Sequence, residues 1–173
     1  MNILELFKKI TTFIFDVDGV LTDGTVLVLD GGLQARRMNI KDGFALQMAI
    51  KNGYRVLVVS GGNSPQVVNR LKKLGITDVY MSVLDKRAFV VDYMTKNNLS
   101  KEQVLFMGDD LPDLPVMSVV GLPVCPSDAV NEIKAAVQYI SPLNGGSACV
   151  REVIEKVLKL NDHWNYNVEI TSR

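Results

Sequence analysis

Two aspartates separated by one residue follow an apolar run near the start of the chain. The run covers residues 13–15, and Asp16 and Asp18 come directly after it. Side chains two positions apart share one face of an extended strand, so these carboxylates would lie side by side and repel each other. A divalent cation that prefers oxygen ligands, such as Mg²⁺, would remove the repulsion. Asp-x-Asp-Gly also ends many strands in a plain turn, so the motif alone leaves both interpretations open.

Three further groups of polar residues each follow a later apolar run. They are Ser60-Gly61-Gly62, Lys86, and Gly108-Asp109-Asp110-Leu111-Pro112-Asp113. A glycine-rich loop before a helix offers free amides to phosphate, and a lysine adds positive charge. Each group has a plainer interpretation: a flexible loop, a solvated lysine, and a helix start with Asp113 as its N-cap.

Apolar strand patterns alternate with helical patterns along the chain. We predict strands at 13–15, 54–59, 78–81, 104–107, 122–124 and 139–140, and helices at 44–51, 65–74, 86–97, 113–119, 129–136 and 148–160. This alternation predicts an α/β fold, a Rossmann-like open parallel sheet with helices on both faces. Ligands bind beyond the carboxyl ends of such strands, and all four polar groups lie there.

The extended stretches 25–29 and 33–40 are joined by Asp30-Gly31-Gly32, which suits a tight hairpin turn. We predict a flap, residues 24–40, in place of a cap domain. Its exposed Val and Leu residues would need a partner surface, although an edge ribbon is the simpler alternative.

The ordered motifs resemble those of the haloacid dehalogenase superfamily of phosphohydrolases. Within it, the chain is similar to the nearly capless branch of 3-deoxy-D-manno-octulosonate 8-phosphate and nonulosonate 9-phosphate phosphatases, over residues 11–158. The residues that carry this resemblance are Leu21-Thr22-Asp23-Gly24, Lys41-Asp42-Gly43-Phe44, the run 108–117, and Gly145-Gly146 followed by Val150-Arg151-Glu152.

The resemblance implies a role for each polar group. Asp16 would be the nucleophile that forms an aspartyl-phosphate, and Asp18 the general acid and then the general base. Phosphate would be bound by Ser60, Gly61, Gly62 and Lys86. Mg²⁺ would be held by the Asp16 carboxylate, the Asp18 backbone carbonyl and Asp109, while Asp110 and Asp113 orient metal-bound waters or Lys86.

The resemblance favours hydrolysis of 3-deoxy-D-manno-octulosonate 8-phosphate for lipopolysaccharide synthesis. Relatives often carry arginines where this chain has Gly62 and Ser147. A sialic-acid-type nonulosonate 9-phosphate therefore stays an alternative substrate, and Arg36, Arg37, Lys41 or Arg70 could supply the missing charge or be surface residues. A non-catalytic subunit would be expected to lack Asp16, Asp18, Lys86 or Asp109, and a phosphomutase usually needs a larger cap.

Composition restricts the partners of this 173-residue chain, which we expect to form a single domain. Basic and acidic residues number 19 each, so no net charge favours nucleic acid or a membrane surface. No signal peptide or spanning segment is evident, and Cys125 and Cys149 suggest free thiols in a reducing cytoplasm. By resemblance we also expect a homotetramer in which the flap and the tail (161–173) help to close neighbouring sites, with Trp164 and Tyr166 docking on a partner subunit.

Overall fold

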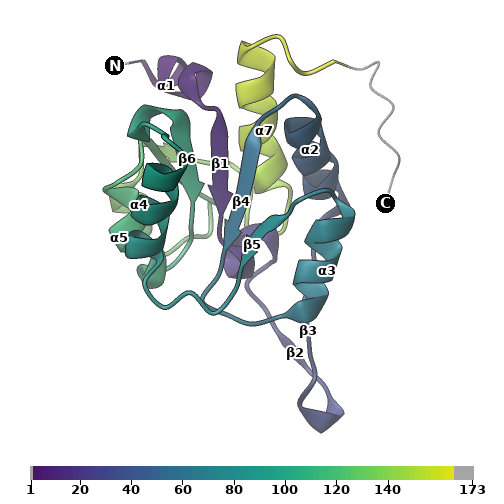
Figure 1. Ribbon diagram of the computed structural model, residues 1–173. Helices are drawn as coiled ribbons and strands as arrows, with labels where there is room; N and C mark the ends of the chain where they lie inside the picture. Colours follow the sequence, from purple (N-terminus) through teal and green to yellow (C-terminus); the bar gives the residue numbers. More distant parts are fainter. Residues whose placement is uncertain (1, 166–173) are drawn as a thin grey trace.

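The computed structural model describes residues 2–165 of the chain, and its centre is a six-stranded parallel sheet (Figure 1). The strand order is β5-β4-β1-β6-β7-β8. The strands are β1 (Thr12–Phe15), β4 (Arg55–Val59), β5 (Asp78–Tyr80), β6 (Val104–Met107), β7 (Leu122–Cys125) and β8 (Tyr139–Ile140). Every pairing between them is parallel, which confirms the predicted α/β class.

Helices cover both faces of this sheet. The apolar residues of α1 (Ile3–Lys9), α2 (Ile40–Lys51), α3 (Pro65–Lys73) and α7 (Cys149–Leu160) join the core on one face. Those of α4 (Lys86–Lys96), α5 (Leu114–Met117) and α6 (Asn131–Ala136) join the core on the other. Across the described residues, no helix is both long enough and apolar enough to cross a membrane.

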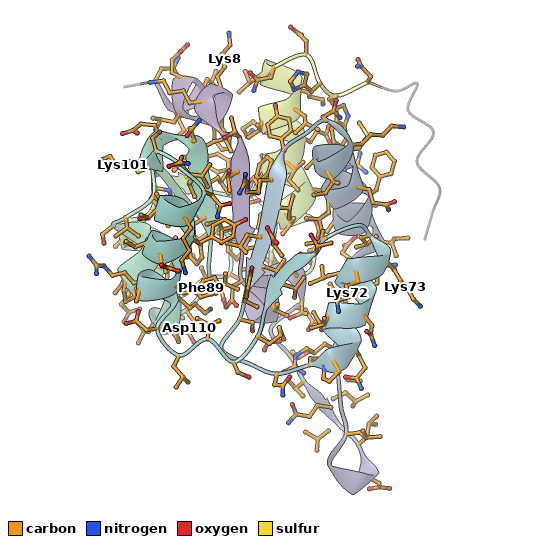
Figure 2. All side chains as sticks on the ribbon, in the orientation of Figure 1. Lys8, Lys72, Lys73, Phe89, Lys101 and Asp110 are labelled. Atoms are coloured by element: carbon orange, nitrogen blue, oxygen red, sulfur yellow. The ribbon has the colours of Figure 1, made fainter. Side chains whose placement is uncertain are left out.

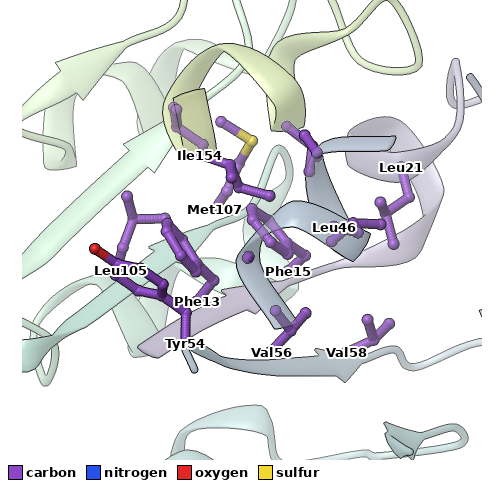
Figure 3. Close-up of a cluster of buried hydrophobic side chains, with 14 of the residues drawn as sticks. Phe13, Phe15, Leu21, Leu46, Tyr54, Val56, Val58, Leu105, Met107 and Ile154 are labelled. Carbon is purple, nitrogen blue, oxygen red and sulfur yellow. The ribbon is translucent and has the colours of Figure 1, made fainter. Parts of the chain in front are cut away.

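The central strand β1 contributes to both cores because its side chains alternate between the two faces. Phe13 and Phe15 stack in parallel, 6.0 Å between ring centroids, among side chains of α2 and α7 (Figure 3). Ile14 lies in the opposite core. Full burial of each such side chain is worth about 1.5–3 kcal/mol. The end of β1, where Asp16 begins, is therefore fixed from both faces.

The predicted flap is present as a separate two-stranded sheet formed by β2 (Leu27–Val28) and β3 (Gln34–Ala35). It extends away from the main body, at the end of the molecule opposite α1 (Figure 1). The positive φ angles of Gly31 and Gly32 permit its turn. The strands are shorter than the predicted 25–29 and 33–40, because Met38 pairs with Thr22 and Asn39 caps α2.

One further interpretation needs correction, and one stays a prediction. Asp113 stands at the N-cap position of α5, but its side chain makes no capping hydrogen bond. Trp164 packs against Phe44 of α2 at 6.0 Å and under the guanidinium of Arg151 at 5.4 Å, and its docking on a partner subunit stays a prediction. The expected docking of Tyr166 concerns a residue outside the described ones.

Candidate active site

Asp16 lies directly after β1, where the chain leaves the sheet. Its Oδ1 accepts a hydrogen bond from the backbone N–H of Val17 at 2.7 Å. The loop then passes close to Asp109, which follows β6: a Cβ on Gly19 would lie 2.0 Å from Asp109 Oδ2. Gly19 also has a φ of +80°. Only glycine satisfies both demands, so the Asp-x-Asp-Gly turn is shaped to bring two acidic segments together.

Lys86 is the first residue of α4 and reaches into the same place. Its Nζ lies 2.9 Å from Asp16 Oδ1 and 2.7 Å from Asp113 Oδ1, and the side chain is buried. Burial acts to lower the pKa of Lys86, but the charges of Asp16 and Asp113 outweigh it, so the net shift is upward. Lys86 is therefore a buried cation held between two carboxylates.

Three carboxylates, two of which contact this lysine, form a tight cluster. Oxygens of Asp16, Asp109 and Asp113 all lie within 4.8 Å of one another. Asp113 Oδ2 also accepts the backbone N–H of Asp109 at 3.0 Å, which fixes the cluster's geometry. Burial, followed by the charge of Asp113, raises the pKa of Asp16 to about 7. Burial, followed by the charge of Asp16, raises that of Asp109 to about 7. A site in which several carboxylate oxygens converge and their negative charge exceeds the nearby positive charge suits a divalent cation.

Asp18 lies apart from this cluster. Its Oδ1 accepts a hydrogen bond from Arg36 Nε at 2.6 Å, and its Oδ2 accepts one from Arg36 Nη2 at 3.3 Å. Arg36 follows β3 at the base of the flap, and its side chain is largely buried. The two carboxylates of the motif therefore face different partners, a buried lysine and a flap arginine.

The segment after β4 contains Ser60, Gly61 and Gly62, the residues that we predict to bind phosphate. Ser60 is buried, and its Oγ accepts the backbone N–H of Gly62 at 3.1 Å. A Cβ on Gly62 would lie 3.3 Å from Asp18 Oδ2 and 3.8 Å from Arg36 Nη2. The glycine thus lets the loop approach the flap arginine and Asp18.

All the predicted site residues line one cleft of about 440 Å³ at the carboxyl ends of the strands. They are Asp16, Asp18, Ser60, Gly61, Gly62, Lys86, Asp109, Asp110 and Asp113. Asp110 is exposed, and its Oδ1 accepts its own neighbour's N–H, that of Leu111. Asp110, which is labelled in Figure 2, lies at the end of the main body from which the flap extends. The cleft therefore gathers residues from four separate loops.

Two features of the cleft were not predicted from the sequence. Asp113, expected only to orient metal-bound waters or Lys86, also has a carboxylate oxygen within 4.8 Å of oxygens of Asp16 and Asp109. Val83 and Leu84 line the mouth, and Leu84 is almost fully exposed. The sequence signal that could have placed these two residues at the cleft is their position directly before Asp85, the N-cap of α4.

Comparison with known proteins gives concordant matches. Residues 75–154 match the model of the haloacid dehalogenase-like hydrolase family. The chain is 32% identical to the 3-deoxy-D-manno-octulosonate 8-phosphate phosphatase KdsC of Escherichia coli K12, over 91% of this chain and 84% of that protein.

Two crystal structures are similar along most of their length. That of the 3-deoxy-D-manno-octulosonate 8-phosphate phosphatase from Yersinia pestis has a TM-score of 0.89 and 31% identity, covering 92% of this chain and 86% of that one. That of the same phosphatase from Moraxella catarrhalis, in complex with magnesium, phosphate and KDO, has a TM-score of 0.89 and 31% identity, covering 93% of both chains.

Proposed function

The chain belongs to the haloacid dehalogenase-like hydrolases and is a phosphatase in the branch of the relatives above, and from this we propose that it hydrolyses 3-deoxy-D-manno-octulosonate 8-phosphate to the free sugar acid and phosphate. The observation that carries the proposal is the cleft that joins Asp16, Lys86 and the acidic cluster. The Moraxella relative, described with magnesium, phosphate and KDO, supports the same chemistry.

We propose that Asp16 attacks the phosphorus, forming an aspartyl-phosphate while the bond to the sugar oxygen breaks. Asp18, after exchanging an Arg36 hydrogen bond for a proton, gives that proton to the sugar oxygen and then takes one from water, which attacks the same phosphorus and frees Asp16. Lys86, 2.9 Å from Asp16, neutralises negative charge as the two anionic groups approach. The Arg36 hydrogen bonds hold the Asp18 carboxylate at the flap side of the cleft.

We propose Mg²⁺ as the cofactor, held by Asp16, Asp109 and the Asp18 backbone carbonyl. The acid cluster fits this ion, because its oxygens converge and because burial and mutual repulsion raise the pKa values of Asp16 and Asp109 to about 7 even with Lys86 beside them. Bound Mg²⁺ would neutralise phosphate charge and align it with the nucleophile. Asp113 would hold Lys86 and the Asp109 amide in position.

The flap supports our proposal of a homotetramer in which flaps and tails close neighbouring sites. Its apolar side chains are exposed, with Leu27 at 62%, Val28 at 72% and Leu33 at 60%. Exposed apolar side chains gathered in this way mark association surfaces. With this assembly we propose a cytoplasmic location and a role in lipopolysaccharide synthesis.

A nonulosonate 9-phosphate is the second candidate substrate, and Gly62 is the observation that keeps it open. Position 62 faces Asp18, Ser60 and Arg36 but carries no side chain. It therefore cannot supply the charge that relatives often place there, so recognition of the sugar acid must depend on other residues.

Phosphate release with Mg²⁺ from both sugar-acid phosphates and from hexose phosphates tests the proposal. We expect the highest kcat/KM for the octulosonate 8-phosphate and loss of activity on chelation by EDTA. Asp16→Asn, purified in parallel, controls for contaminating phosphatases. A preference for the nonulosonate would replace the proposed substrate, and a uniform profile would refute a dedicated sugar-acid phosphatase.

A further inference from the structure

Asp42 is a buried carboxylate that the proposed reaction does not use. It lies in the first turn of α2, is 2% exposed, and its Oδ2 has no hydrogen-bond partner among the described residues. Its Oδ1 accepts the backbone N–H of Arg151, in the first turn of α7, at 2.7 Å. The N-cap of α7, Ala148, has no side-chain acceptor of its own. Asp42 therefore supplies, from another helix, the acceptor that this N-terminus requires.

The residues just before α7 press against the loop that follows Asp16. Gly145 packs so closely that an added Cβ would lie 1.9 Å from the carbonyl oxygen of Gly19. The backbone N–H of Gly146 donates to Val20 O at 3.0 Å, and Asn39 Nδ2 donates to Gly146 O at 3.1 Å. The start of α7 and the loop 17–24 thus form one tightly packed unit.

The contacts continue from this unit into the acidic cluster. Gly19, touched on one side by Gly145, lies against Asp109 on the other, where an added Cβ would be 2.0 Å from Oδ2. Any outward shift of the start of α7 would free the loop that carries Asp18 and borders Asp109. Displacements of about 1 Å in a catalytic group can cost on the order of 10²-fold in rate.

We propose that Asp42 is a positioning residue: by capping α7 from α2, it holds the Gly145–Gly146 turn against the loop 17–24 and so fixes the spacing of Asp16, Asp18 and Asp109. This inference rests on the proposed roles of those three aspartates. It assigns a function to two sequence motifs, Lys41-Asp42-Gly43-Phe44 and Gly145-Gly146, that contribute no reacting group.

The test compares Asp42→Ala, Asp42→Asn and Gly145→Ala, with Gly121→Ala as a matched control. A Cβ on Gly121 would also strike a backbone carbonyl, that of Lys101 at 2.4 Å. Gly121 precedes β7, however, and so lies at the amino end of that strand, whereas the cleft lies at the carboxyl ends. All four variants are measured with p-nitrophenyl phosphate, and kcat is expressed per folded molecule.

We expect Asp42→Ala and Gly145→Ala to lower kcat by about tenfold or more, with KM changed by less than about threefold. Asp42→Asn should retain most of the activity, because its amide oxygen can still accept the Arg151 N–H. Gly121→Ala should lower stability but leave kcat unchanged. Unaltered kcat in Asp42→Ala and Gly145→Ala, an equal fall in Gly121→Ala, or no rescue by Asn would each overturn the inference. If Gly145→Ala does not fold, Asp42→Ala and its rescue by Asn decide the question.

Mg²⁺ affinity, measured by calorimetry, gives a readout that does not depend on turnover. We expect it to fall by about tenfold in Asp42→Ala and Gly145→Ala and to be unchanged in Gly121→Ala. Unchanged affinity in all four variants would count against the positioning role. If the wild-type protein hydrolyses p-nitrophenyl phosphate but no sugar-acid phosphate, the substrate proposal fails while this inference is still decided by these variants.

Discussion

The cleft and the flap reverse the usual distribution of polar and apolar side chains in opposite ways. In the cleft, three charged side chains are buried, with Lys86 at 5%, Asp16 at 8% and Asp113 at 1% exposure. In the flap, apolar side chains are exposed, and Figure 2 shows the flap projecting below the main body. Charged residues are rarely buried without partners, and apolar residues rarely cluster on a surface without function.

The cleft and the flap each lack a partner, but the partners differ in kind. The cleft holds a cluster of three carboxylates, of which Lys86 contacts two, so the cluster lacks positive charge, which a cation can supply. The flap lacks an apolar surface to cover it, which a second copy of the chain can supply. The Asp18–Arg36 pair joins them, because Arg36 stands at the base of the flap and Asp18 at the cleft.

The largest effect is expected for Asp16→Asn. The amide is nearly isosteric with the carboxylate but is a poor nucleophile and a poor Mg²⁺ ligand, so we expect kcat to fall by about 10³-fold or more. Circular dichroism and thermal melting should show an intact fold. Near-normal turnover with both sugar-acid phosphate and p-nitrophenyl phosphate would contradict the assignment of Asp16 as nucleophile.

Lys86→Met tests whether the buried charges of the cleft depend on one another. Removal of the lysine leaves Asp16 and Asp113 without their cation, so we expect the free energy of unfolding to drop by about 3–5 kcal/mol in EDTA. Saturating Mg²⁺ should recover part of the loss. Lys96→Met is the matched control: Lys96 pairs with Asp92 on the surface, and its loss should change stability by less than about 1 kcal/mol. Equal effects of the two substitutions on urea unfolding would show that the cleft pair has no special role.

Asp42, a carboxyl group buried outside the cleft, tests what burial of a charge costs where no lysine among the described residues compensates for it. Burial raises the pKa of Asp42 to about 6 from its usual 3.8, with the Arg151 amide acting against the shift. Between these pH values the native state binds more protons than the unfolded state, so unfolding free energy falls as pH rises. Above pH 6 the full loss, about 3 kcal/mol, is present.

Asp42→Asn removes this titration while keeping an acceptor for Arg151. We therefore expect the free energy of unfolding of the variant, relative to that of wild type, to rise by about 3 kcal/mol between pH 4 and pH 7. Urea unfolding at each pH measures this difference. All other titrating groups are shared by the two proteins and cancel in the difference. A constant difference across this range would mean that Asp42 does not titrate with a raised pKa.

The smallest effect is expected in the flap. Replacing Leu27 and Val28 together by serine removes exposed apolar surface, so we expect smaller species in sedimentation experiments. We also expect kcat/KM to fall by about tenfold with the sugar-acid phosphate and by less than about twofold with p-nitrophenyl phosphate. Asp30→Asn, at the tip of the same hairpin, is the control. An unchanged sedimentation profile would rule out these side chains as the association surface.

Much of the fold was predictable because its signals are local. Apolar runs located all six strands of the main sheet, and Pro65, preceded by the capping residue Ser64, marked the start of α3. The start of α2 differs from the prediction of residue 44. This helix begins at Ile40 because the side chain of Asn39 caps it by accepting the N–H of Lys41. The helix predicted for 113–119 is shorter, since residues 111–113 form a 3₁₀ turn and α5 covers Leu114–Met117.

The sequence by itself determined the order of the strands along the chain, the loops that carry polar residues, and the chemistry that those residue types can perform. Only the tertiary structure decided that Asp113 joins Asp16 and Asp109, that Arg36 faces Asp18, and that Asp42 caps α7. These are contacts between residues up to 109 positions apart. They depend on which strands become neighbours and how closely loops pack, and local periodicity contains no information about either.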